Sequence, residues 1–149
     1  MEKGGKRSLR LLGAIAVALA GIGAFVWLGE SEPKNAYGFQ EAVYEYGELR
    51  HEIYYGTEVD TSLLRDFGDA LAEAGYFGEQ YGGIARLVTE GEAYRVDLAY
   101  PERLWGDEAF LEDMRVLAED LRTFALERPV RLYLVDVDEE GVYEKRVEE

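Results

Sequence analysis

The residues of this chain that could do chemistry are mostly carboxylates. Its 149 residues include 31 Asp and Glu, a single histidine, His51, and no cysteine. Thiol catalysis needs a cysteine, and ordinary zinc or iron sites need several His or Cys ligands. A Ser-His-Asp triad would have to use Ser62, near a predicted helix start, where a serine usually acts as a cap. We therefore predict no catalytic residue and no cofactor, and keep an enzyme of unknown type as an alternative.

The remaining titratable groups give no specific signal. Pairs of carboxylates are so frequent in this acidic chain that their spacing does not indicate glycosidase chemistry. His51 lies between Arg50 and Glu52 in a predicted strand, where we expect a half-buried surface residue. A pH-sensing role for His51 is the alternative, because imidazole titrates near neutrality.

One run of acidic residues resembles the start of a calcium loop. Asp136, Asp138 and Glu140 stand at positions one, three and five, and Gly141 stands at position six. Position twelve is Val147, where such a loop requires a bidentate Glu, and no helix precedes the run. An acidic turn between two strands accounts for the same residues. The three carboxylates are therefore only candidate metal ligands, and a calcium-stabilised or small-ligand-binding domain is an alternative function.

Hydrophobic periodicity divides the second part of the chain into strands and helices. Residues 37–47 are read as a short helix or a lead-in to the first strand. Asp107 is the expected N-cap of the second helix, and Gly75 and Pro129 follow the two helix ends. Strands are expected at 48–55, 84–89, 93–100 and 130–137, helices at 60–74 and 107–127, and a return strand at 142–147.

This order predicts an α+β fold, a ferredoxin-like βαββαβ sandwich with both helices on one face. The opposite face would then carry Tyr54, Leu87, Tyr133 and Val135 among charged residues. An apolar, tyrosine-bearing patch with a charged rim is typical of a protein interface. The alternative is that residues 37–47 or the C-terminal tail cover this patch. The side chains assigned to the helix-facing side are Leu49, Ile53, Val96, Leu98, Leu132 and Leu134.

The uncharged segment 11–29 follows a basic stretch and predicts a transmembrane anchor. Because Lys and Arg resist translocation, residues 1–10 should stay in the cytoplasm. The expected organisation is then a linker or lead-in over 30–47 and an extracytoplasmic domain over 48–149. Cleavage after Ala20, as in a signal peptide, is the alternative.

Two further properties bear on the partners. Within 11–29, Ala16, Ala20 and Ala24 are spaced so that two helices could approach closely, which suggests a homodimer, although alanine is common in membrane spans. From Glu30 onward the chain has 30 acidic and 12 basic residues, a net charge of −18. Such a field repels phosphate backbones, so nucleic acid is not expected as a partner.

The run ELRHEIYYGTEVDTSLLRDFGDALAEAGYFG, the hairpin ending in YRVDLAY, and PVRLYLVDVD together resemble a bacterial module found in membrane-anchored or secreted proteins. That module, whose function is unknown, pairs a strand of the type VYYT-x-V with a helix ending L-x-x-x-G-[YF]-F. The resemblance covers residues 48 to about 145 and implies no catalytic residue. The sequence therefore predicts a non-catalytic, membrane-anchored interaction or accessory module of an envelope complex, with a protein partner.

Overall fold

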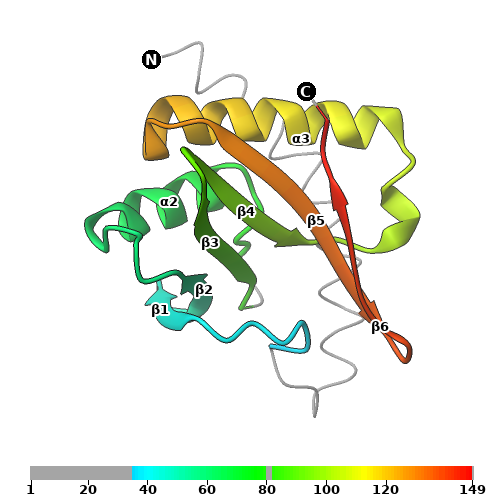
Figure 1. The fold of residues 1–149 in the computed structure, drawn as a ribbon, viewed down its shortest axis with the longest axis horizontal. Helices are drawn as coiled ribbons and strands as arrows, with labels where there is room; N and C mark the ends of the chain where they lie inside the picture. Colours follow the sequence, from blue (N-terminus) through cyan, green and yellow to red (C-terminus); the bar gives the residue numbers. More distant parts are fainter. Residues whose placement is uncertain (1–34, 80–81, 149) are drawn as a thin grey trace.

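The computed structural model describes residues 35–79 and 82–148. They form a mixed α+β fold in which two α-helices cover one face of a six-stranded sheet (Figure 1). The predicted anchor at 11–29, with its possible cleavage site and dimer contact, lies outside the described residues. Within the described part, no helix is both long enough and apolar enough to cross a bilayer.

The observed elements follow the predicted ones closely, with one addition. Residues 37–47 contribute a strand of their own, β1, which forms a hairpin with β2. The strand expected from residue 48 starts only at His51, because Leu49 and Arg50 belong to the hairpin turn, where Arg50 has a φ of 56°. The bounds are β1 Ala42–Tyr46, β2 His51–Tyr55, α2 Ser62–Glu73, β3 Ile84–Glu90, β4 Ala93–Ala99, α3 Glu108–Leu121, β5 Val130–Asp138 and β6 Gly141–Arg146.

The helix boundaries have local causes. The side chain of Asp107 accepts hydrogen bonds from the backbone N–H groups of Ala109 and Phe110, as an N-cap does. The predicted helix over 107–127 ends as α-helix at Leu121 and continues as a wider turn over Arg122–Leu126. Gly75 follows α2 with a φ of 88°, which glycine adopts without strain.

The strand order corrects the ferredoxin-like expectation. In a split βαβ sandwich, another strand lies between the two parallel strands of each unit. Here the sheet order is β1-β2-β3-β4-β5-β6, so β2 pairs directly with β3, and β4 pairs directly with β5. The fold is therefore two unsplit βαβ units joined by the β3–β4 hairpin and flanked by two edge hairpin strands.

Both helices lie on the same face of the sheet, although the two crossovers that place them there cannot both be right-handed. The second unit runs antiparallel to the first, while the sheet continues in one direction from β1 to β6. The hand of a βαβ crossover depends on the strand direction, on the direction in which the chain moves across the sheet, and on the face that the helix covers. The two crossovers here differ only in strand direction, so they must have opposite hands. One of the two crossovers is therefore left-handed, against the usual preference.

The main core lies between the sheet and the two helices. Ile53, Val96, Leu98, Leu132 and Leu134 face the helices as predicted, and each is at most 1% exposed. Leu49 does not, because its turn leaves it 37% exposed. The helices contribute buried side chains from one stripe each, chiefly Leu64, Phe67 and Leu71 from α2 and Met114, Leu117 and Leu121 from α3.

Tyr76, just after α2, joins the ends of β3 and β4 through its side chain. Its hydroxyl donates to the carbonyl oxygen of Ile84 at 2.5 Å and accepts from the backbone N–H of Ala99 at 2.7 Å. Ile84 and Ala99 would be the next pair after Ala85 and Leu98, so the phenol bridges the end of the ladder. Burial raises the pKa of Tyr76 far above its ordinary value, which keeps the hydroxyl protonated.

We expect Tyr76→Phe to lower the free energy of unfolding by about 1–3 kcal/mol, because it leaves a buried N–H and C=O unpaired. Tyr100→Phe is the matched control. Tyr100 is equally buried, yet its hydroxyl has no hydrogen-bond partner among the described residues, so its removal should leave stability unchanged or higher. Urea unfolding followed by circular dichroism measures both. Equal losses in the two variants would contradict this assignment.

Candidate functional site

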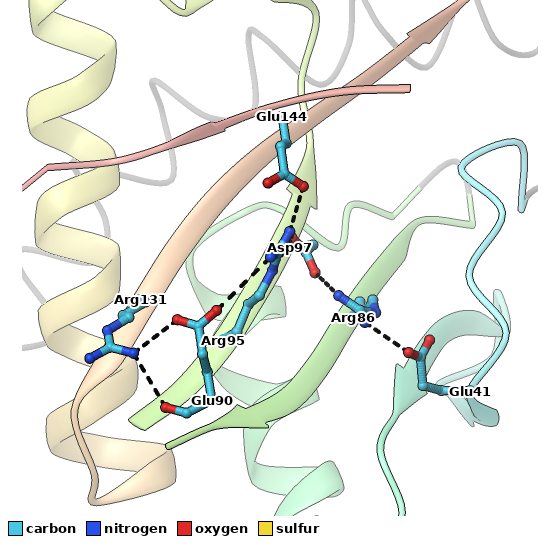
Figure 2. A network of polar contacts seen from close by, with 7 residues as sticks. All are labelled: Glu41, Arg86, Glu90, Arg95, Asp97, Arg131 and Glu144. Carbon is cyan, nitrogen blue, oxygen red and sulfur yellow. Dashed lines mark hydrogen bonds and ion pairs between the residues drawn. The ribbon is translucent and has the colours of Figure 1, made fainter. Parts of the chain in front are cut away.

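The sheet face opposite α2 and α3, here called the helix-free face, carries a network of charged side chains. Period-two alternation brings them to this face, because they alternate with the residues of the main core. Figure 2 shows how they connect across the sheet, from the segment before β1 to β6. The members are three arginines, Arg86, Arg95 and Arg131, and four carboxylates, Glu41, Glu90, Asp97 and Glu144.

Asp97 is the centre of this network. Its side chain has no exposed area. One carboxylate oxygen accepts from Arg86 at 2.7 Å, and the other accepts from Arg95 Nε at 3.0 Å. Arg86 also pairs with Glu41 at 2.8 Å, and Arg95 pairs with Glu144 at 2.8 Å (Figure 2). Each arginine thus joins the buried carboxylate to a more exposed one, which offsets the cost of burying the charge.

Two arginines of the network, Arg86 and Arg95, remain charged at every working pH. Burial is the largest single effect and lowers the pKa of Arg86 and Arg95. The hydrogen bonds and charges of their carboxylate partners together outweigh it and raise both pKa values. The guanidinium of Arg95 also lies 3.7 Å from the centre of the Tyr133 ring, in a cation–π contact. Each charged side chain of the network has at least one ion-pair partner, while Oε1 of Glu41 is buried without a hydrogen-bond partner among the described residues. Ion-paired side chains of this kind can position one another and bind a complementary group.

Glu41 should make stability fall on acidification. Its hydrogen bond to Arg86 is the main cause of a pKa below the ordinary 4.5. A carboxyl group whose pKa is lower in the folded state stabilises the fold above the unfolded pKa, and the contribution is lost as pH falls through the folded pKa. We expect urea unfolding to lose less stability between pH 6 and about pH 3 in Glu41→Gln than in the unaltered chain. Glu119→Gln, in an exposed pair with Arg122, is the control. An identical loss in Glu41→Gln and the unaltered chain would contradict this.

The segment Asn35–Glu41, here called the strap, crosses the helix-free face before β1. Tyr37 and Phe39 stack on each other with ring centres 5.7 Å apart and pack on a second, smaller buried cluster. In Figure 1 the strap is the cyan segment that leads into β1. The cluster beneath the strap contains one residue from each of β2 to β5: Tyr54, Ile84, Ala99 and Val135.

A shallow groove of about 360 Å³ adjoins the strap. The strap and the side chains of Val142 and Glu144 from β6 contribute to its lining. Arg86, Arg95, Asp97 and Val135 also line it, so the groove combines paired charges with apolar surface. Val142 is 50% exposed, which makes it the most accessible large apolar side chain described on this face.

The four predicted interface residues have different surroundings in the structure. Leu87 is misplaced by the prediction: it is completely buried in the main core and faces the helices, because it pairs with Val96. Tyr54 and Val135 do belong to the helix-free face, but the strap covers them, as the alternative expectation held. Tyr133 is half-buried on the same face, beneath Arg95. The accessible part of the predicted patch is therefore the side nearer β6.

His51 and Ser62 both take part in contacts that hold the fold together. His51 is 4% exposed, which corrects the half-buried surface position expected for it. Its ring stacks on Phe77 at 4.3 Å, and its Nδ1 accepts a hydrogen bond from the backbone N–H of Gly83 at 2.7 Å. Ser62 begins α2, and its backbone N–H donates to the side chain of Asp60 at 2.9 Å.

Of the candidate calcium ligands, Asp136 and Asp138 lie at the end of β5, and Glu140 lies in the turn that leads to β6. Asp136 accepts hydrogen bonds from the backbone N–H groups of Glu102 and Val137, and Asp138 accepts one from Glu140. The bond from Glu140 to Asp138 lies in the β5–β6 connection, so this run ends in an acidic turn between two strands, which is the alternative expected for it. Over residues 35–79 and 82–148, no group of three or more His, Cys, Asp or Glu is arranged to hold a metal ion.

Sequence reasoning missed the network and the strap as functional elements. The alternation of Arg95 and Asp97 with Val96 and Leu98 placed both charges on the helix-free face. Their partners Arg86 and Glu41, however, come from other segments, and the pairing depends on strand order. The sequence predicted residues 37–47, which include Tyr37 and Phe39, only as a short helix or a lead-in to the first strand, and not as a segment that lies on the sheet.

No protein-family model matches this chain, and comparisons with curated proteins and with solved structures also found no match. The resemblance to a bacterial module therefore stays a prediction from the sequence.

Proposed function

We propose that this chain is a single-pass, membrane-anchored protein-interaction module whose domain lies outside the cytoplasm and binds its partner through the helix-free face. The anchor rests on the uncharged segment 11–29 and its basic flank, which favour an N-terminus inside. The role is that of an accessory subunit in an envelope complex. It does not involve nucleic acid, because the exported part is strongly anionic.

The single observation that carries the proposal is the composition of the accessible part of the helix-free face. Val142 and Arg95 line the groove there, and the half-buried Tyr133 ring lies against the Arg95 guanidinium. Tyrosine and arginine are the residues most often found at the centre of binding surfaces, and a mixed polar surface of this kind suits a non-obligate partner. The ion pairs with Asp97 hold Arg86 and Arg95 in position.

The experiment compares two equivalent substitutions on opposite faces. Val142 and Phe124 are exposed to 50% and 53%, but Phe124 follows α3 in the helix layer. Full-length tagged chains carrying Val142→Asp or Phe124→Asp are purified from membranes, and the stoichiometry of co-purifying protein is measured. We expect Val142→Asp and Tyr133→Ala to lose a stoichiometric partner that Phe124→Asp retains. Retention in all three variants, or loss in all three, would overturn binding through this face.

A further inference from the structure

The strap has the features of a ligand that is built into the chain. It lies on the helix-free face, and the side chains that hold it come from four strands that are distant in the sequence. A surface that fits one short aromatic segment in this way also fits the same segment supplied from elsewhere. The features of the strap therefore describe what this face recognises.

The strap carries its own shape. The side-chain oxygen of Asn35 accepts from the backbone N–H of Phe39 at 2.8 Å, and its amide donates to the Phe39 carbonyl at 2.5 Å. Gly38, with a φ of 75°, allows the tight turn between the two aromatic residues. Because these bonds lie within five residues, a short free segment could form the same turn, which lowers the entropy cost of binding.

Three side chains of the strap contact the sheet, and each meets a complementary group. The Phe39 ring lies 5.6 Å from the Tyr54 ring and 5.6 Å from the guanidinium of Arg86. Tyr37 is half-buried against the cluster beneath the strap, and this burial raises its pKa to about 12. Glu41 forms an ion pair with Arg86 at 2.8 Å. The recognised pattern is two aromatic residues two positions apart, followed two positions later by an acidic residue.

The packing of the strap is separate from that of the main core. The cluster beneath it belongs to the opposite face of the sheet from α2 and α3. Undocking of the strap would expose Tyr54 and Val135 but leave the contacts between sheet and helices in place. Local openings of this kind require less free energy than global unfolding.

We propose that the strap is an internal competitor for the partner site, and that the partner contributes an extended segment of the type aromatic-x-aromatic-x-acidic that takes its place. This inference rests on the proposed function and specifies the partner's chemistry. The strap lies within the predicted linker or lead-in over 30–47, shortly after the predicted anchor at 11–29, so this face of the domain would lie close to the membrane. Partner binding then requires exchange of one aromatic segment for another.

The test uses the full-length chain in lipid nanodiscs and a fluorescent peptide with the sequence of residues 35–42. The peptide is titrated against the unaltered chain and against a Tyr37→Ser, Phe39→Ser variant, whose own strap competes poorly. Because an attached segment acts at millimolar effective concentration, we expect the variant to bind the peptide at least about tenfold more tightly. The control peptide carries the same two serine substitutions. Equal affinity of the two proteins for the aromatic peptide, or equal affinity of the variant for both peptides, would overturn the proposal.

Hydrogen exchange of the unaltered chain provides a readout that does not depend on a variant. The amide of Phe39 should exchange through local opening, with a lower opening free energy than the amides of Val96 and Leu134 in the central strands. Exchange of Phe39 only through global unfolding would overturn a detachable strap. A partner can be lost in Val142→Asp and yet bind the strap variant and the unaltered chain with equal affinity. That result would leave the proposed function intact and reject this inference alone. If the strap variant binds the aromatic peptide tightly but no partner co-purifies with the chain, the competition by the strap is supported and the proposed function is rejected.

Discussion

Replacing Asp97 with alanine should lower the free energy of unfolding by about 3 kcal/mol or more. The reason is that Arg86 and Arg95, whose side chains are 22% and 18% exposed, would face each other without the carboxylate that lies between them. Removing one partner of a buried pair costs more than the pair itself contributes, because the remaining charges keep their desolvation cost. Urea unfolding at neutral pH measures the loss.

The matched control for Asp97→Ala is Glu119→Ala, which removes a pair with Arg122 in which both side chains are more than half exposed. That change should alter stability by less than about 1 kcal/mol. A double-mutant cycle with Arg95→Met tests the cause, since Asp97→Ala should cost less when one of the two cations is already absent. Additive losses in the cycle would show that the pair is not coupled.

Leu87→Asp should prevent stable folding. Leu87 is completely buried between the sheet and the helices, so the new carboxylate would lie in the main core. An unpaired buried charge costs several kcal/mol, and the lost apolar packing adds about 2–5 kcal/mol, as in large-to-small core substitutions. Together these terms approach the whole stability of a domain of this size, about 5–15 kcal/mol. Thermal denaturation followed by circular dichroism should show no cooperative transition.

Two further variants separate these contributions. Leu87→Ala removes only the packing and should retain a cooperative transition at a lower Tm. Val142→Asp introduces the same charge at a half-exposed position of the helix-free face and should leave the Tm nearly unchanged. Similar behaviour of Leu87→Asp and Val142→Asp would contradict the assignment of Leu87 to the main core. The same contrast makes Val142, and not Leu87, the suitable position for probing an interface.

Local patterns were enough to predict most of the elements. The helix expected at 60–74 is found at Ser62–Glu73, because its apolar stripe and Gly75 are short-range signals. Asp107 caps the second helix, since an N-cap requires only the residue and the next turn. The β3–β4 hairpin also carried enough information to place Leu87. Its two-residue turn pairs Glu90 with Ala93, so Leu87 must lie beside Val96 on the helix-facing side.

The arrangement of the strands was not accessible in this way. The sequence order of strands and helices is compatible with a split sandwich and with two adjacent βαβ units, because both satisfy the same periodicities. The choice depends on which strand edges pair, and this involves contacts between distant residues such as Tyr54 with Arg86 and Asp97 with Tyr133. Rules of handedness favour one answer but did not predict the observed combination of opposite hands.

The sequence alone determined the charge, the alternation that sends Arg95 and Asp97 to one face, and the helix ends, since each depends on a few neighbouring residues. Only the tertiary structure decided that Glu41 meets Arg86 and that Tyr37 and Phe39 cover residues of four strands. The physical reason is that both arrangements join segments whose contact becomes favourable only after the sheet has brought them together. The candidate site is a property of that assembly and not of any one segment.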